Sequence, residues 1–152
     1  MEAPGFSEAS LSLRDLALGF AAGAIAVVAF HQSVILGAFL AGLTPNSPWS
    51  LRPIPPLGVP LIVSQMFWGG LWGTLFAFVW PLVPGRHYWQ KGVIFSLIGP
   101  LLLGSWILVP LIKQSGALFA GFSPLRLALG LCLSTAWGAG SGLLFGAVPR
   151  RH

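Results

Sequence analysis

The chain has 152 residues, of which 55% are hydrophobic and only 7% are charged, and its mean hydropathy is +0.84. A soluble domain carries about 25% charged residues, so this composition excludes an ordinary water-soluble domain and indicates one membrane domain over residues 1–152. The net charge is +5, but the basic residues are scattered between apolar runs, which excludes a nucleic-acid-binding surface.

The first apolar stretch covers residues 16–40. It is long enough to cross a hydrocarbon core of roughly 30 Å, which takes about 20 helical residues. His31, Gln32 and Ser33 interrupt this stretch with three consecutive polar side chains. An ionisable residue inside a membrane helix is a candidate functional site by default, so His31 is the leading candidate in this segment.

The next segment, residues 44–60, contains six prolines. Such a run favours an extended, polyproline-like path and excludes a regular helix. One interpretation is a stiff connector on the outer side of the membrane. The other is a docking surface for a partner, with Trp49 as its exposed anchor.

Three further apolar stretches cover residues 57–83, 92–112 and 127–149, and each is long enough to span a membrane. With the first stretch they predict an all-α fold, a polytopic integral membrane protein with four transmembrane helices in a compact bundle. Lys and Arg in the short loops number five on the side of the two termini and three on the other side, which favours cytoplasmic termini. The five are Arg14, Arg86, Lys91, Arg150 and Arg151, and the three are Arg52, Lys113 and Arg126.

Small residues and aromatic residues recur at four-residue intervals on these helices. Glycine at this spacing lets another helix approach closely, either within the chain or from another subunit. The aromatic stripe on the second helix fits lipid-facing or core packing, or a surface for a pigment, a quinone or a partner helix. The glycines are Gly19, Gly23, Gly69, Gly73, Gly138, Gly142 and Gly146, and the stripe is Trp68, Trp72, Phe76 and Trp80.

The second and fourth stretches share a nine-residue pattern, Trp-Gly-x-x-x-Gly-x-Leu-Phe, at residues 68–76 and 137–145. The two copies match at five positions with a constant offset of 69 residues. This indicates two repeated helical hairpins in parallel orientation, as in some membrane proteins. Chance similarity is the alternative, because these residue types are common in the chain.

Polar side chains on all four predicted helices fall at a similar depth near the outer side. One interpretation is interhelical hydrogen bonding. The other is a small site that opens outward for a lipid headgroup or a quinone, with His31 as an axial ligand if the occupant is a haem-type metal centre. The sequence predicts no cofactor beyond these options. The layer comprises His31, Gln32, Ser33, Ser64, Gln65, Ser105, Ser134 and Thr135.

No catalytic constellation is present in the sequence. Acid–base and hydrolytic mechanisms usually need a carboxylate, or a histidine held by one. The three acidic residues, Glu2, Glu8 and Asp15, all precede the first apolar stretch. We therefore expect no enzyme, and the same lack of intramembrane carboxylates disfavours an ion-coupled transporter.

We expect a small accessory, assembly or structural subunit of a larger membrane complex, because the sequence is rich in residues suited to helix packing and contains no catalytic constellation. Its partners would be membrane lipids and other membrane subunits or further copies of itself. The alternative is an oligomeric carrier or channel for a small or lipidic solute, and a remote alternative is a haem-, quinone- or pigment-binding protein using His31. The excess of Arg over Lys and the high Gly, Ala and Pro content favour a bacterial inner membrane.

Overall fold

The computed structural model describes residues 11–113 and 116–149, so the predicted charges at Glu2, Glu8, Arg150 and Arg151 lie outside the described residues. The described chain is mostly helical, which confirms the all-α class. Within it, four helices are long and apolar enough to cross a membrane. They are Leu13–Leu40, Leu61–Val79, Tyr88–Ile112 and Pro124–Ala147.

Two of these four helices are interrupted by π-helical segments. The elements in chain order are α1 (Leu13–Ala26), a π segment (Val27–His31), α2 (Gln32–Leu40), β1 (Pro53–Ile54), β2 (Val59–Pro60), α3 (Leu61–Val79), α4 (Tyr88–Ser96), a second π segment (Leu97–Leu108), α5 (Val109–Lys113), a short 3-10 segment (Leu118–Phe122) and α6 (Pro124–Ala147).

Three of the four helices begin a few residues before the apolar stretches that predicted them, because polar or proline caps precede the apolar residues. Ser12 and Asp15 form a capping box, in which each side chain accepts the backbone N–H of the other. Such a box satisfies N–H groups that have no partner at a helix start. The Gln90 side chain accepts the backbone N–H groups just before α4, and Pro124 occupies the first turn of α6.

The proline-rich segment folds back on the start of α3. Its two short strands pair antiparallel, with Pro53 opposite Pro60. The first two N–H groups of α3, those of Leu61 and Ile62, donate to carbonyls of the same loop. The loop is therefore a folded cap on α3.

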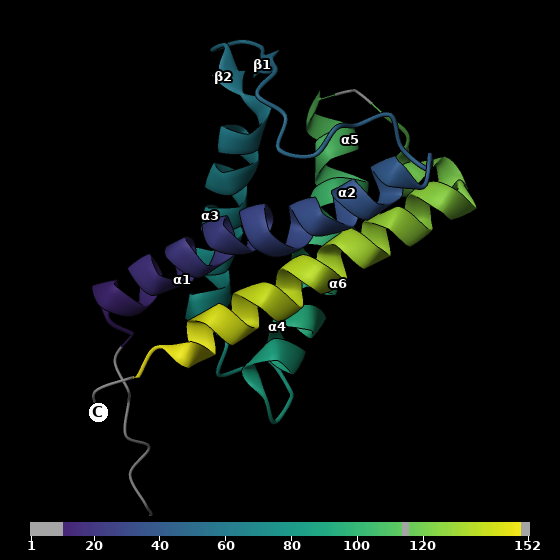
Figure 1. The fold of residues 1–152 in the computed structure, drawn as a ribbon. Helices are drawn as coiled ribbons and strands as arrows, with labels where there is room; N and C mark the ends of the chain where they lie inside the picture. Colours follow the sequence, from purple (N-terminus) through teal and green to yellow (C-terminus); the bar gives the residue numbers. More distant parts are fainter. Residues whose placement is uncertain (1–10, 114–115, 150–152) are drawn as a thin grey trace, which may run out of the picture.

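The helices form two layers (Figure 1). α1–α2 and α6 lie side by side and cross obliquely over a second layer made of α3 and α4–α5. α1 packs mainly on α3 and α4 packs mainly on α6, so each hairpin is a close helix pair. The core lies where the pairs meet, and Phe76 and Phe145 are both fully buried there with ring centroids 5.6 Å apart.

Direct backbone contact at glycines holds each hairpin together. A Cβ built on Gly23 would fall on the carbonyl of Gly69, and a Cβ built on Gly92 would fall on the carbonyl of Gly138. Helices in a lipid bilayer have no hydrophobic drive to associate, and close van der Waals packing at small residues of this kind supplies much of the attraction between them there. The two contacts are related by the same 69-residue offset as the sequence pattern.

The other predicted glycines also lie against neighbouring helices of the same chain. Gly19 contacts Gly73, and both Gly142 and Gly146 contact Tyr88. The sequence left open whether these glycines pack internally or against another subunit. The structure assigns them to contacts within the chain.

A test of this packing is the substitution Gly23→Ala. We expect a loss of about 1 to 3 kcal/mol of stability, because the added methyl group cannot enter the contact with Gly69 without separating α1 from α3. The matched control is Gly37→Ala on the same span, where a Cβ has nothing within 4 Å. The measurement is thermal unfolding in detergent, followed by tryptophan fluorescence. An equal loss of stability in the two variants would contradict the proposed role of the Gly23–Gly69 contact.

Candidate functional site: the glutamine node and the outer cavities

The first membrane-length helix widens at Val27–His31, where it changes from α to π geometry. The N–H of Gln32 donates to the carbonyl of Val27, five residues back. This shift frees the neighbouring carbonyl of Val28, which accepts the indole N–H of Trp49 at 3.0 Å. Single π turns inside α-helices occur frequently at functional sites. This one accepts a hydrogen bond from Trp49 of the proline-rich loop.

Gln32 is the centre of a polar cluster that we call the glutamine node, formed by Gln32, Gln65 and Trp49. Its side chain is 2% exposed. Its Nε2 donates to Oε1 of Gln65 at 2.8 Å, and its Oε1 accepts the backbone N–H of Trp49 at 2.8 Å. One buried amide therefore joins α2, α3 and the proline-rich loop.

Trp49 is held at both of its N–H groups by the first helix. Its backbone lies in the left-handed region, with φ of +46°, a conformation that costs roughly 1–3 kcal/mol for a residue with a side chain. The two hydrogen bonds, to Gln32 and to Val28, offset this cost. Part of the ring remains exposed. The structure thus gives Trp49 an anchoring role within the chain, and its predicted contact with a partner stays a prediction.

Of the eight predicted polar residues, the structure joins Gln32 and Gln65 to each other by a side-chain hydrogen bond. Ser33 and Ser105 donate to carbonyls of their own helices, and Thr135 is exposed. The physical reason is that a serine hydroxyl can bond a carbonyl one turn back, so it needs no partner on another helix. Ser64 is half-buried, and Ser134 takes part through its backbone carbonyl. Among these eight residues, the glutamine pair forms the side-chain to side-chain hydrogen bond between helices.

His31 lies in the π segment, next to the glutamine node. Its Nδ1 is buried and has no hydrogen-bond partner among the described residues. Within residues 11–113 and 116–149, no group of three or more His, Cys, Asp or Glu side chains could hold a metal ion. His31 therefore belongs to no cluster of three such side chains in the described chain.

Sequence reasoning missed two serines at the centre of the bundle, Ser96 and Ser141, both of which are fully buried. The Ser96 hydroxyl lies 2.7 Å from the carbonyl of Ser134 and links α4 to α6. The Ser141 hydroxyl has no hydrogen-bond partner in the described part of the chain. Both serines sit among apolar residues at no distinctive spacing, so hydropathy alone carried no signal for them.

The predicted aromatic stripe of α3 winds from the surface into the core. Trp68 is exposed, and Trp72 packs against the glycines of the second π segment. Phe76 is fully buried. Trp80 contacts Tyr88 and lies under the ammonium of Lys91, 4.9 Å from the ring centroid. The stripe is therefore not one continuous surface.

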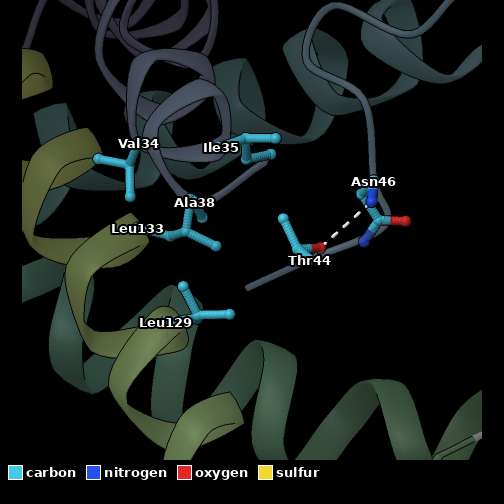
Figure 2. A pocket seen from close by; sticks show the side chains of 7 residues that line it. All are labelled: Val34, Ile35, Ala38, Thr44, Asn46, Leu129 and Leu133. Atoms are coloured by element: carbon cyan, nitrogen blue, oxygen red, sulfur yellow. Dashed lines mark hydrogen bonds between the residues drawn. The ribbon is translucent and has the colours of Figure 1, made fainter. Parts of the chain in front are cut away.

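Two cavities of about 120 Å³ each lie at the end of the bundle that carries the proline-rich loop. The first is an apolar groove between α2 and α6, closed on one side by the turn at Thr44 and Asn46 (Figure 2). The second is a polar cavity within the proline-rich loop. Asn46 lines both. The groove is lined by Val34, Ile35, Ala38, Thr44, Asn46, Leu129 and Leu133, and the polar cavity by Pro45, Asn46, Ser47, Ser50, Arg52 and Leu61.

The substitution Gln32→Leu tests the node. We expect a loss of about 1 to 2 kcal/mol, because the Gln65 amide and the Trp49 N–H lose their buried partner. The Trp49 amide should also exchange its hydrogen faster, since the loop is released from the helix. The control is Ser105→Ala, which removes a hydroxyl bonded only to its own helix. Unchanged exchange at Trp49 in the Gln32 variant would refute the anchoring role.

Comparison with known protein families, curated proteins and solved structures found no match for this chain.

Proposed function

We propose that this chain is an integral membrane protein of four transmembrane helices that acts as an accessory subunit of a larger membrane complex. In this proposal, the outward face of α3 binds a transmembrane helix of a partner protein. The observation that carries the proposal is an exposed tryptophan on that face, Trp68, whose N–H group has no acceptor in the described chain.

Insertion in a membrane is supported by length, composition and the positions of the loops. Each of the four long helices covers the roughly 20 residues that a bilayer requires. Their outward faces carry many large apolar side chains, and soluble monomeric proteins rarely expose so many to water. At the inner end, Arg14 reaches toward the carbonyl of Pro149, which brings the beginning of α1 and the end of α6 to the same side.

A duplicated hairpin is supported by three pairs of equivalent features. The Gly23–Gly69 and Gly92–Gly138 contacts correspond under the 69-residue offset. The π segments begin at Val27 and Leu97, within one residue of equivalence. Finally, the equivalent rings of Phe76 and Phe145 touch each other, as residues near a two-fold axis must. We infer that the bundle derives from two copies of one hairpin.

The outward face of α3 is the surface we assign to the partner. It carries large side chains at helical spacing, all of them exposed, whereas the opposite face holds the glycines that contact α1. Trp and Phe dominate it, and such residues are enriched in protein–protein contacts. The face consists of Phe67, Trp68, Leu71, Leu75 and Phe78.

Trp68 distinguishes this face from an ordinary lipid-facing one. It is 57% exposed and lies seven residues into α3, about 10 Å along the helix. Its indole N–H has no hydrogen-bond acceptor in the described part of the chain. An unpaired N–H in hydrocarbon is unfavourable, so an acceptor from a partner helix would stabilise it. A carbonyl or hydroxyl group on the partner would satisfy this requirement.

The carrier alternative has weaker support from the geometry. Phe76, Phe95 and Phe145 fill the centre of the bundle, where a path between the two hairpins would run. Both outer cavities lie at one end of the molecule. Transport through a single chain would require these three rings to separate.

The partner proposal is tested with Trp68→Leu combined with Leu71→Ala. Wild-type particles extracted gently from their own membrane should be larger than the 16.1 kDa chain and should contain a defined partner. We expect the amount of partner that co-purifies with the double variant to fall at least about tenfold, because a buried Trp at an interface commonly contributes about 2 kcal/mol or more.

The matched control combines Leu131→Ala with Leu143→Ala, which removes two exposed leucines from α6. This variant should keep the partner, measured by mass spectrometry of the purified particles. Gly138 and Gly142 are unsuitable positions for this test, because they pack against α4. Particles that contain only this chain, or equal retention in both double variants, would overturn the proposal.

The proposed topology, with both termini cytoplasmic, is tested with single cysteines. In a Cys132→Ala background, Leu57→Cys lies in the outer loop and Leu82→Cys in the loop between α3 and α4, and both native side chains are 83% exposed. A membrane-impermeant maleimide added to intact cells should label position 57 alone, and position 82 only after permeabilisation. The reverse pattern would show the opposite orientation.

A further inference from the structure

The two outer cavities differ sharply in chemistry and meet at Asn46. The groove between α2 and α6 is lined mainly by aliphatic side chains, and it extends from Ala38 and Leu129 toward Val34 and Leu133, away from the outer loop (Figure 2). An apolar cavity of roughly 150 Å³ takes up a group the size of benzene. A groove of about 120 Å³ therefore suits a short length of hydrocarbon chain.

The polar cavity is lined by one cation and several hydrogen-bond donors. Arg52 supplies a guanidinium with five N–H donors, Asn46 an amide, and Ser47 and Ser50 hydroxyls. Leu61, the first residue of α3, also lines the cavity, and its own N–H group is already bonded to the carbonyl of Arg52. These groups together favour an anion.

No carboxylate of the described chain balances Arg52. The one acidic residue in residues 11–113 and 116–149 is Asp15, which is bonded to Ser12 at the other end of the first helix. The cavity is thus a positively charged, donor-rich site, and in the topology proposed above it lies at the membrane boundary where lipid phosphates are found. Arginine binds phosphate through two parallel hydrogen bonds.

We propose that the polar cavity and the groove together bind one anionic phospholipid. Its phosphate lies among Asn46, Ser50 and Arg52, and one acyl chain enters the groove between α2 and α6. The node residue Trp49, bonded to the first helix at both N–H groups, lies between Asn46 and Arg52 in the sequence and fixes the loop that carries both. The site is separate from the outward face of α3 and does not depend on the partner proposed there.

The test uses the purified full-length chain in detergent, free of partners. The probes are dioleoyl phosphatidylglycerol and dioleoyl phosphatidylcholine, which share acyl chains and differ in net charge. Native mass spectrometry counts the lipid molecules that each protein variant retains. We expect wild type to retain one phosphatidylglycerol in preference to phosphatidylcholine.

Two pairs of variants locate the site. Arg52→Gln should lower phosphatidylglycerol retention about tenfold, whereas Arg126→Gln, which removes an exposed cation at the start of α6, should not. Leu133→Trp should lower retention by filling the groove, whereas Leu131→Trp, at an exposed position nearby, should not. Arg52→Lys should retain more phosphatidylglycerol than Arg52→Gln but less than wild type, because it keeps the charge and loses the two parallel hydrogen bonds.

Three outcomes would overturn the proposal. One is equal retention of the two lipids by wild type. Another is an equal effect of the Arg52 and Arg126 variants. The third is tight binding of soluble glycerol phosphate with no effect of Leu133→Trp, because that would show an anion site that uses no acyl chain.

Discussion

Backbone contact between glycines is the constraint on which the rest of this structure depends. Gly23 against Gly69 and Gly92 against Gly138 leave no room for a Cβ, and lipid offers no hydrophobic drive to replace that contact. These contacts also set the rotation of α3. Because its glycine face is turned to α1, the side chains of Phe67, Trp68 and Leu71 are turned outward. The surface available to a partner is thus a consequence of the internal packing.

The two halves of the chain use the same frame differently. Gln32 and Leu101 are equivalent under the 69-residue offset, and both are buried, at 2% and 3% exposed. Leucine fills that position in the second half, where no amide is present. In the first half the amide holds Trp49, and with it the loop that forms the polar cavity. The glutamine node therefore holds the loop of the polar cavity in place.

The apolar stretches predicted the four helices well, because hydropathy reports directly on residues that can face lipid. Helix starts were placed less accurately, since Ser12 with Asp15 caps α1 from outside the apolar run. The Gln32–Gln65 pair could be predicted from the sequence, because two amides at the same depth in apolar surroundings each need a hydrogen-bond partner. The cavities were not, since they depend on how the loop around Trp49 folds back, and no pattern in residues 44–60 encodes that path.

Site-specific photo-crosslinking in the native membrane can show whether α3 contacts a partner protein. A photoreactive residue at Leu71 on α3 and another at Leu143 on α6 would probe two exposed positions of the same bundle. The account predicts one discrete crosslinked protein from position 71 and none from position 143. Crosslinks to lipid alone from position 71, or the same protein from both positions, would contradict the assignment of α3 as the partner-binding face.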